Sequence, residues 1–115
     1  MVDVEKLLCD TIEKLNFNIY LQGSLKEDEI EDKEFCTYSL DPIEEIFKDN
    51  APVMAHWLFD FNFYSINKNY GATFENLLLE LKKVGFVPVG RGMGVMSDNK
   101  RFAGRSVQIR YKEIY

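Results

Sequence analysis

The stretch that decides the fold is Val53-Met-Ala-His-Trp-Leu-Phe-Asp-Phe-Asn-Phe-Tyr-Ser65. Its odd-numbered positions through position 63 are all apolar, whereas its even-numbered positions are mixed and mostly polar. Side chains of a β-strand alternate between two faces, so this pattern predicts a long strand with one buried face and one half-solvated face. We therefore expect Trp57, Phe59 and Phe61 to lie in the core.

A helix is expected on each side of this strand along the chain. Residues 3–15 carry apolar side chains at three- and four-residue spacing, and Asp3 can cap their first turn. Residues 72–84 show the same spacing, and Gly85 stands where a C-terminal cap favours positive φ. The apolar stripe of this second helix is expected to pack against the central strand through Leu77, Leu78 and Leu81.

Shorter segments complete the expected sheet. Alternating apolar and polar residues predict strands at 17–22, 35–40 and 106–112, and weaker strand segments at 86–89 and 93–96 around a glycine-rich bend. Residues 43–49 are expected to form one or two turns of helix, because Asp41-Pro42 ends the strand before them. This order predicts an α+β fold, with a mostly antiparallel sheet of four to five strands and two main helices packed on one face.

The size of the chain predicts a single domain over residues 1–115, since 115 residues bury one core but not two. Residues 26–34 hold six acids and two lysines around a lone Ile30, so we expect a flexible acidic loop there. No apolar stretch reaches the roughly 20 residues of a membrane span, and we expect no membrane partner. The acidic, amphipathic N-terminus does not resemble a signal peptide.

The two cysteines, Cys9 and Cys36, favour a reducing, cytoplasmic environment in which both thiols act as small hydrophobic side chains. We do not expect a disulfide between them. The chain carries a net charge of −5, which does not favour sequence-specific nucleic-acid binding, because that needs clustered Lys and Arg against phosphates.

Charge is divided unevenly along the chain. Residues 1–50 hold 14 acidic and 5 basic side chains, whereas residues 51–115 hold 5 acidic and 9 basic ones. This asymmetry is suited to head-to-tail packing of copies, an acidic surface of one against a basic surface of the next. Solvated faces on a monomer are the alternative.

No residue pattern points to catalysis, a cofactor or a metal. His56 and Asp60 are four residues apart, but on a strand this separation is about 13 Å, too far for one ion. The glycines of residues 90–94 follow Pro88 and lead into strand-like residues, unlike a phosphate-binding loop that opens a helix. A serine nucleophile would need a histidine base, and His56 is the only histidine. We expect a protein that is not an enzyme.

The charged residues between 97 and 105 are the best candidates for a contact between copies. Asp98, Lys100, Arg101 and Arg105 are expected to form a charged turn before the last strand. The glycine-rich bend, which holds Arg91, is a second candidate, as a contact arm. A solvated hairpin or bend is the alternative for both.

Several short motifs occur in a recognisable order over residues 17–112. They are Phe35-x-Thr37-Tyr38, Asp49-Asn50, Phe63-Tyr64-Ser65, Gly85-Phe86, Asp98, Gly104-Arg105 and Val107-x-Ile109-x-Tyr111. Together they resemble the small tail-terminator and tail-completion proteins of long-tailed bacteriophages and prophages. The acidic loop and the bend at 90–94 are not features of that family.

This resemblance implies a structural role in virion assembly. Tail terminators cap the growing tail tube as a ring, usually a hexamer, stop its polymerisation and provide the surface that joins the head. The partners implied are other copies of the chain, the tail tube and head-connector proteins. The location implied is the bacterial host cytoplasm and then the tail or neck of the virion. Tail terminators, other connector components and tube components are not separated by the sequence.

Two alternatives come from other classes of protein. A small acidic immunity protein, which binds and neutralises a toxin, fits the acidity, the size and the lack of catalytic groups equally well. A small-ligand-binding domain would require a large apolar pocket, which a sequence does not reveal.

Overall fold

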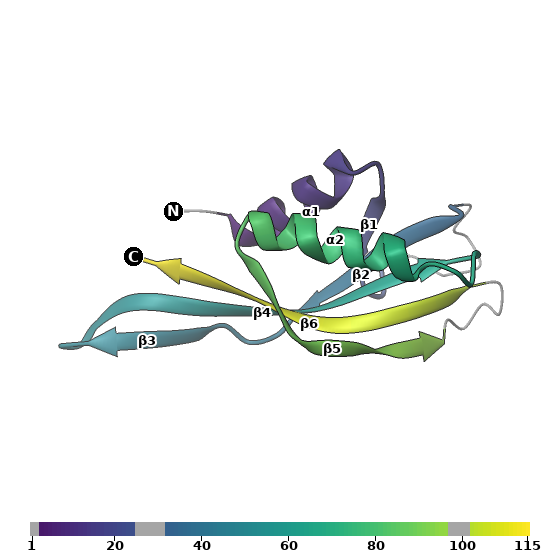
Figure 1. Cartoon of the computed structure of the whole chain (residues 1–115). Helices are drawn as coiled ribbons and strands as arrows, with labels where there is room; N and C mark the ends of the chain where they lie inside the picture. Colours follow the sequence, from purple (N-terminus) through teal and green to yellow (C-terminus); the bar gives the residue numbers. More distant parts are fainter. Residues whose placement is uncertain (1–2, 25–31, 97–101) are drawn as a thin grey trace.

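Strand β4 (Ala51–Ser65) is the longest strand of the computed structural model and lies at the centre of its sheet. The structure describes residues 3–24, 32–96 and 102–115. In chain order the other elements are α1 (Val4–Lys14), β1 (Asn18–Leu21), β2 (Glu34–Leu40), β3 (Glu44–Lys48), α2 (Gly71–Lys83), β5 (Phe86–Met96) and β6 (Ala103–Ile114). These elements form the α+β fold expected from the sequence (Figure 1).

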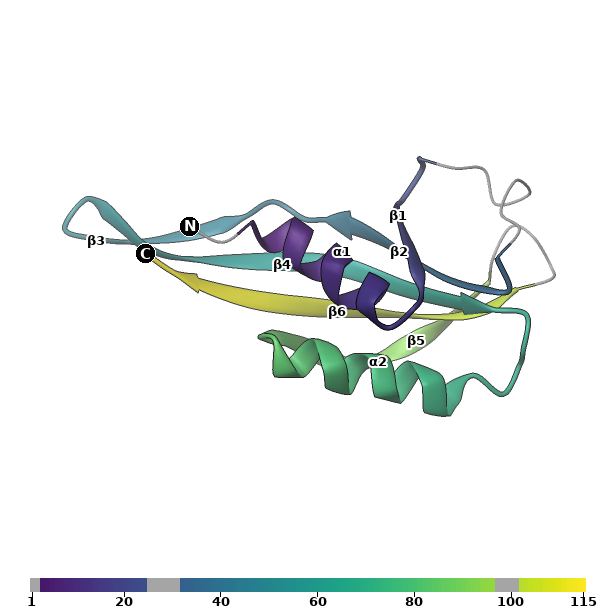
Figure 2. The same cartoon turned by 90° about the horizontal axis from the view of Figure 1, so that it is seen from above.

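The six strands form one sheet in the order β1-β2-β4-β6-β5, and β3 pairs with β4 beyond the end of β2. Every pairing is antiparallel except that of β1 with β2. Both helices lie on the same face of this sheet, as expected (Figures 1 and 2). The strand count is six rather than four to five, because β3 is a strand.

The core lies between the helices and the sheet. Four of the expected core residues are fully buried: Phe59, Phe61, Leu77 and Leu81. Trp57 and Leu78 are partly buried and pack against the same cluster. Helix α1 contributes Val4, Leu8 and Ile12, all fully buried. The odd-numbered face of β4 is therefore the buried face predicted by the alternation.

The expected helical turns at residues 43–49 are not formed, and β3 (Glu44–Lys48) stands in their place. Strand β2 stops near Asp41-Pro42, but β3 then pairs with the same strand β4. Asp49 and Asn50 have φ angles of 53° and 65°, and they join β3 to β4 as a two-residue hairpin loop. Asp and Asn tolerate the left-handed conformation that a twist-compatible hairpin loop requires, so the turn favours a hairpin.

The glycine-rich bend at residues 90–94 is an irregularity within β5 and does not end the strand. Strand β5 pairs with β6 on both sides of it, and the register shifts between Val89 and Met93. Gly90 and Gly92 have φ angles of 82° and 78°. A Cβ on Gly92 would lie 2.6 Å from the carbonyl oxygen of Ser106, so glycine is required at this bulge.

The helix boundaries follow the expected signals. The Asp3 carboxylate accepts a hydrogen bond from the backbone N–H of Lys6 at 3.0 Å and caps α1. Gly85 follows α2 with a φ of 110°. Of the part of the chain that the structure describes, no helix is long and apolar enough to cross a membrane.

The expected flexible loop at 26–34 falls mostly outside the described residues, which resume at Asp32. The Asp32 carboxylate accepts hydrogen bonds from the Asn18 amide at 2.9 Å and from the Tyr20 hydroxyl at 2.6 Å. Glu34 already belongs to β2. Within the described residues, the C-terminal end of the expected loop contacts β1 and enters β2, and the flexibility expected for 26–34 stays a prediction.

A small second cluster forms where β2 and β4 face away from the helices. Phe35 is fully buried there and packs against Phe102 and Tyr64, with both ring-centroid distances 5.1 Å. A Cβ on Gly104 would lie 2.5 Å from the Tyr64 ring, so this ring requires glycine beside it. The rest of this face is not covered by a helix (Figure 1).

Candidate interaction surfaces

The structure places two of the four expected interface residues. Asp98 and Arg101 lie outside the described residues. Arg91 belongs to β5, at the bulge. Arg105 belongs to β6, where it pairs in register with Phe63 of β4 and Gly94 of β5.

Arg105 is not the exposed turn residue that the sequence suggested. It sits inside the sheet, and its guanidinium carbon lies 5.7 Å from the centroid of the Phe74 ring on α2. A guanidinium over an aromatic face is a stabilising arrangement. The prediction was wrong because the last strand begins at Ala103, earlier than the alternation from Ser106 indicated.

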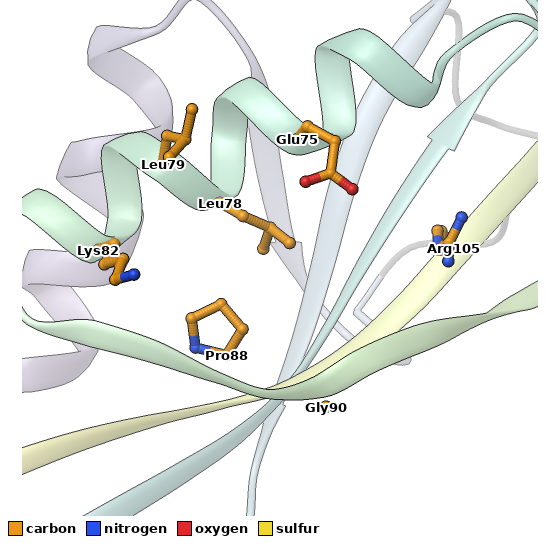
Figure 3. Close-up of a pocket in the computed structure, with 7 residues that line it drawn as sticks. All are labelled: Glu75, Leu78, Leu79, Lys82, Pro88, Gly90 and Arg105. Carbon is orange, nitrogen blue, oxygen red and sulfur yellow. The ribbon is translucent and has the colours of Figure 1, made fainter.

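Arg105 lines one end of a groove between α2 and β5, with a volume of about 490 Å³. Residues of α2 and β5 line this groove together with Arg105 of β6, and Leu78 of α2 lies near Pro88 of β5 (Figure 3). They combine apolar and charged types: Glu75, Leu78, Leu79, Lys82, Pro88, Gly90 and Arg105. We call this site the α2–β5 groove.

The apolar part of the α2–β5 groove is partly open to solvent. Leu79 is 59% exposed, an unusual position for leucine on a helix that also buries Leu77 and Leu81. Lys82 lies on the same helix, and it takes no part in the ion pair between Lys83 and Glu80. The groove therefore offers an apolar floor with a cation beside it.

A hairpin projects from one end of the molecule (Figure 1). It consists of β3 and the part of β4 paired with it, residues 44–56, and we call it the arm. The arm extends beyond both helices in the two views (Figures 1 and 2). Within the described residues, β3 pairs only with β4, so its outer edge is open. A projecting hairpin with an open edge is available to another chain.

The arm is acidic and carries an exposed aromatic ring. Glu44, Glu45 and Asp49 outnumber Lys48. Phe47 is 59% exposed. The charged residues protect the open edge from indiscriminate strand pairing, whereas an exposed Phe at the end of a hairpin marks a candidate contact.

The helix-free face of the sheet is the third candidate surface. Its exposed apolar side chains come from β5 and the end of β6: Val87, Val89, Met93 and Ile114. Two cations, Arg110 and Lys112, are exposed on the same face, and neither forms an ion pair with any residue that the structure describes. A mixed apolar and basic surface of this kind is typical of protein-binding faces.

Two carboxyl groups also meet on this face. Partial burial, followed by the neighbouring Asp41, raises the pKa of Asp60. The Asp41 carboxylate accepts a hydrogen bond from the Gln108 amide at 3.1 Å. Asp41 lies in the connection between β2 and β3, so this hydrogen bond joins the base of the arm to β6.

The other residues considered for chemistry are not brought together. His56 borders a small hollow with Arg110 and Lys112, while Cys36 is in the core. Cys9 and Cys36 are free, and burial raises the pKa of both thiols, which lowers their reactivity. Among the described residues, no group of three His, Cys, Asp or Glu side chains is placed to hold a metal ion.

Comparison of the sequence with models of known protein families and with curated proteins found no match.

Sequence reasoning missed the arm and the groove. Asp49-Asn50 was an available signal for the arm, because two residues that tolerate positive φ between apolar segments favour a hairpin. Leu79 lies off the expected apolar stripe of Leu77, Leu78 and Leu81, since helical spacing puts it on another face, and it is exposed in the structure. No signal in the sequence indicated the groove.

Proposed function

We propose that this protein is a structural component of phage or prophage tails, of the tail-terminator or tail-completion type, which works as a ring of copies at the end of the tail tube. The order of motifs along residues 17–112 supports this role. The observation that carries it is the helix-free face of the sheet, where exposed apolar residues stand beside Arg110 and Lys112. A face of this composition favours binding to other proteins over chemistry.

The uneven charge of the chain also supports association of copies. The arm carries part of the acidic half, and the helix-free face and α2 carry several of the basic residues. Contacts between unlike surfaces are heterologous, and they close into a ring when the rotation between neighbouring copies divides a full turn. The partners are thus further copies, the tail tube and head-connector proteins.

The test is deletion of the gene from the phage or prophage that encodes the chain, followed by electron microscopy of the particles. We expect tails of unregulated length, or tails that fail to join heads. The wild-type gene supplied in trans should restore normal virions. Normal virions from the deletion alone would overturn the proposed function.

A variant of the helix-free face ties the phenotype to that surface. Replacing both exposed cations, Arg110→Glu and Lys112→Glu, changes no buried residue, so the fold should be kept. We expect this double variant not to restore virions. Full rescue by the double variant would mean that the two cations of the helix-free face are not needed for tail assembly.

A further inference from the structure

The arm and the α2–β5 groove are complementary in shape and chemistry. The arm presents Phe47, 59% exposed, beside acidic side chains. The groove presents Leu78, Leu79 and Pro88 with Lys82 beside them. A phenylalanine buries roughly 150–250 Å² when it is covered, and a groove of about 490 Å³ has room for its ring.

The arm and the groove of one copy do not meet. Pairing with β4 fixes β3 in place, and β4 is in turn paired with β6 from Met54 onward. The arm points away from both helices, whereas the groove is bordered by α2 (Figures 1 and 3). A hairpin held by these pairings does not fold back over its own sheet, so a matching partner must be another molecule.

We propose that Phe47 inserts into the α2–β5 groove of a second copy of this chain. The occupant is a copy because arm and groove have opposite charges and occur on the same chain. Glu44, whose partner His56 lies on the same face of β4 as Pro52 opposite Phe47, is then placed to face Lys82. This inference rests on the self-association in the proposed function, and it names the residues that make the contact.

The contact is heterologous, since the arm of one copy meets the groove of the next. One inserted ring with its flanking charges is smaller than the roughly 1,000 Å² of a stable interface, so a single contact is weak. In a closed ring every copy inserts one arm and receives one. A copy therefore leaves the ring only when two contacts break. The contact therefore favours closed rings over open dimers.

The first experiment measures association of the full chain by sedimentation velocity over a concentration series. Phe47→Ser and Leu79→Glu change exposed positions on the two sides of the contact, and each should weaken association at least about 10-fold, as expected for a central contact residue. Leu21→Ser is the matched control, because Leu21 is 49% exposed at the end of β1 and belongs to neither surface. Circular dichroism checks that each variant is folded.

The second experiment traps the contact by disulfide formation in a Cys9→Ser background. A mixture of Phe47→Cys chains and Leu79→Cys chains should give a cross-linked dimer, and neither variant alone should do so. Cross-linking of Phe47→Cys with itself would mean that arms meet each other, and it would overturn the proposal.

The outcomes separate this inference from the proposed function. If Phe47→Ser and Leu79→Glu associate as strongly as the wild-type chain, the arm contact is overturned. The proposed function is not affected by that outcome. If the wild-type chain does not sediment as an oligomer, and the two cysteine variants form no mixed disulfide, the arm contact is overturned as well. The proposed function itself fails only if deletion of the gene leaves virions normal.

Discussion

Phe59 shows how one buried ring joins several strands of the sheet. Its ring is fully buried and contacts three aromatic neighbours on three strands: Tyr38, Trp57 and Phe86. We expect Phe59→Ala to lower the free energy of unfolding by about 3–5 kcal/mol, because the change leaves a cavity that the strands do not fill. Urea denaturation measures the loss.

Leu79→Ala is the control for that measurement. Leu79 is 59% exposed on α2, and alanine favours helix, so we expect a change within about 0.5 kcal/mol. A Phe59→Ala protein as stable as its parent would contradict the position of this ring at the centre of the core.

Asp60 makes the stability of the fold depend on pH. Burial and Asp41 raise its pKa, so the folded state favours the protonated carboxyl group. This contribution to stability is fully present below the ordinary pKa of an aspartate, about 3.9, and is lost as the pH rises through the raised pKa. Asp60→Asn should therefore stabilise the protein at neutral pH, by less than about 1 kcal/mol because the group is partly solvated.

Thermal unfolding of Asp60→Asn and the parent between pH 3.5 and 7 checks this expectation. The difference in free energy of unfolding between the two proteins should grow as the pH rises. A difference that grows as the pH falls would mean that Asp60 is stabilised in its charged form.

At the residue scale, the sequence predicted burial better than it predicted contacts. Period-two alternation identified Phe59 and Phe61 as core residues, because burial on one face of a strand is a local property of the chain. The position of Arg105 over Phe74 depends on how β6 pairs with β4 and how α2 lies across them. No local pattern carries that information.

At the scale of elements, the hairpin loop of the arm is the sharpest correction to the sequence interpretation. Asn50 has a φ of 65°, which costs a β-branched residue about 1–2 kcal/mol. We expect Asn50→Val to speed amide hydrogen exchange in β3 about 10-fold, since the cost opens the arm locally.

Asn50→Gly is the matched variant and should leave exchange in β3 unchanged or slower, because glycine adopts positive φ without strain. A hairpin and a helix at residues 43–49 predict opposite orders of amide exchange rate for these two variants. In a helix, valine is favoured over glycine, so slower exchange in Asn50→Val than in Asn50→Gly would contradict the hairpin.

The helices and four of the strands were predictable because each buries one face in a regular period. Strand β3 was not, because Glu44-Glu45-Ile46-Phe47-Lys48 lacks strict alternation and its conformation is set by pairing with β4. The break at the glycines of β5 was placed correctly, but its nature as a bulge depends on β6 continuing beside it.

At the scale of the whole molecule, three candidate surfaces are distinguished: the arm, the α2–β5 groove and the helix-free face. In our proposal the arm and the groove make the contacts between copies, and the helix-free face, with Arg110 and Lys112, binds the tail tube or the head connector. This division gives each surface one class of partner. The groove itself was not predictable, because α2 and β5 form it only when packed.

The measurement that tests the central claim most directly is the location of the protein in assembled particles. Phage from the complemented deletion, carrying an affinity-tagged chain, are labelled against the tag and viewed by electron microscopy. We expect label at the head-proximal end of the tail tube, as a ring of copies. Tails of normal length and attachment that carry no label at that end would contradict it.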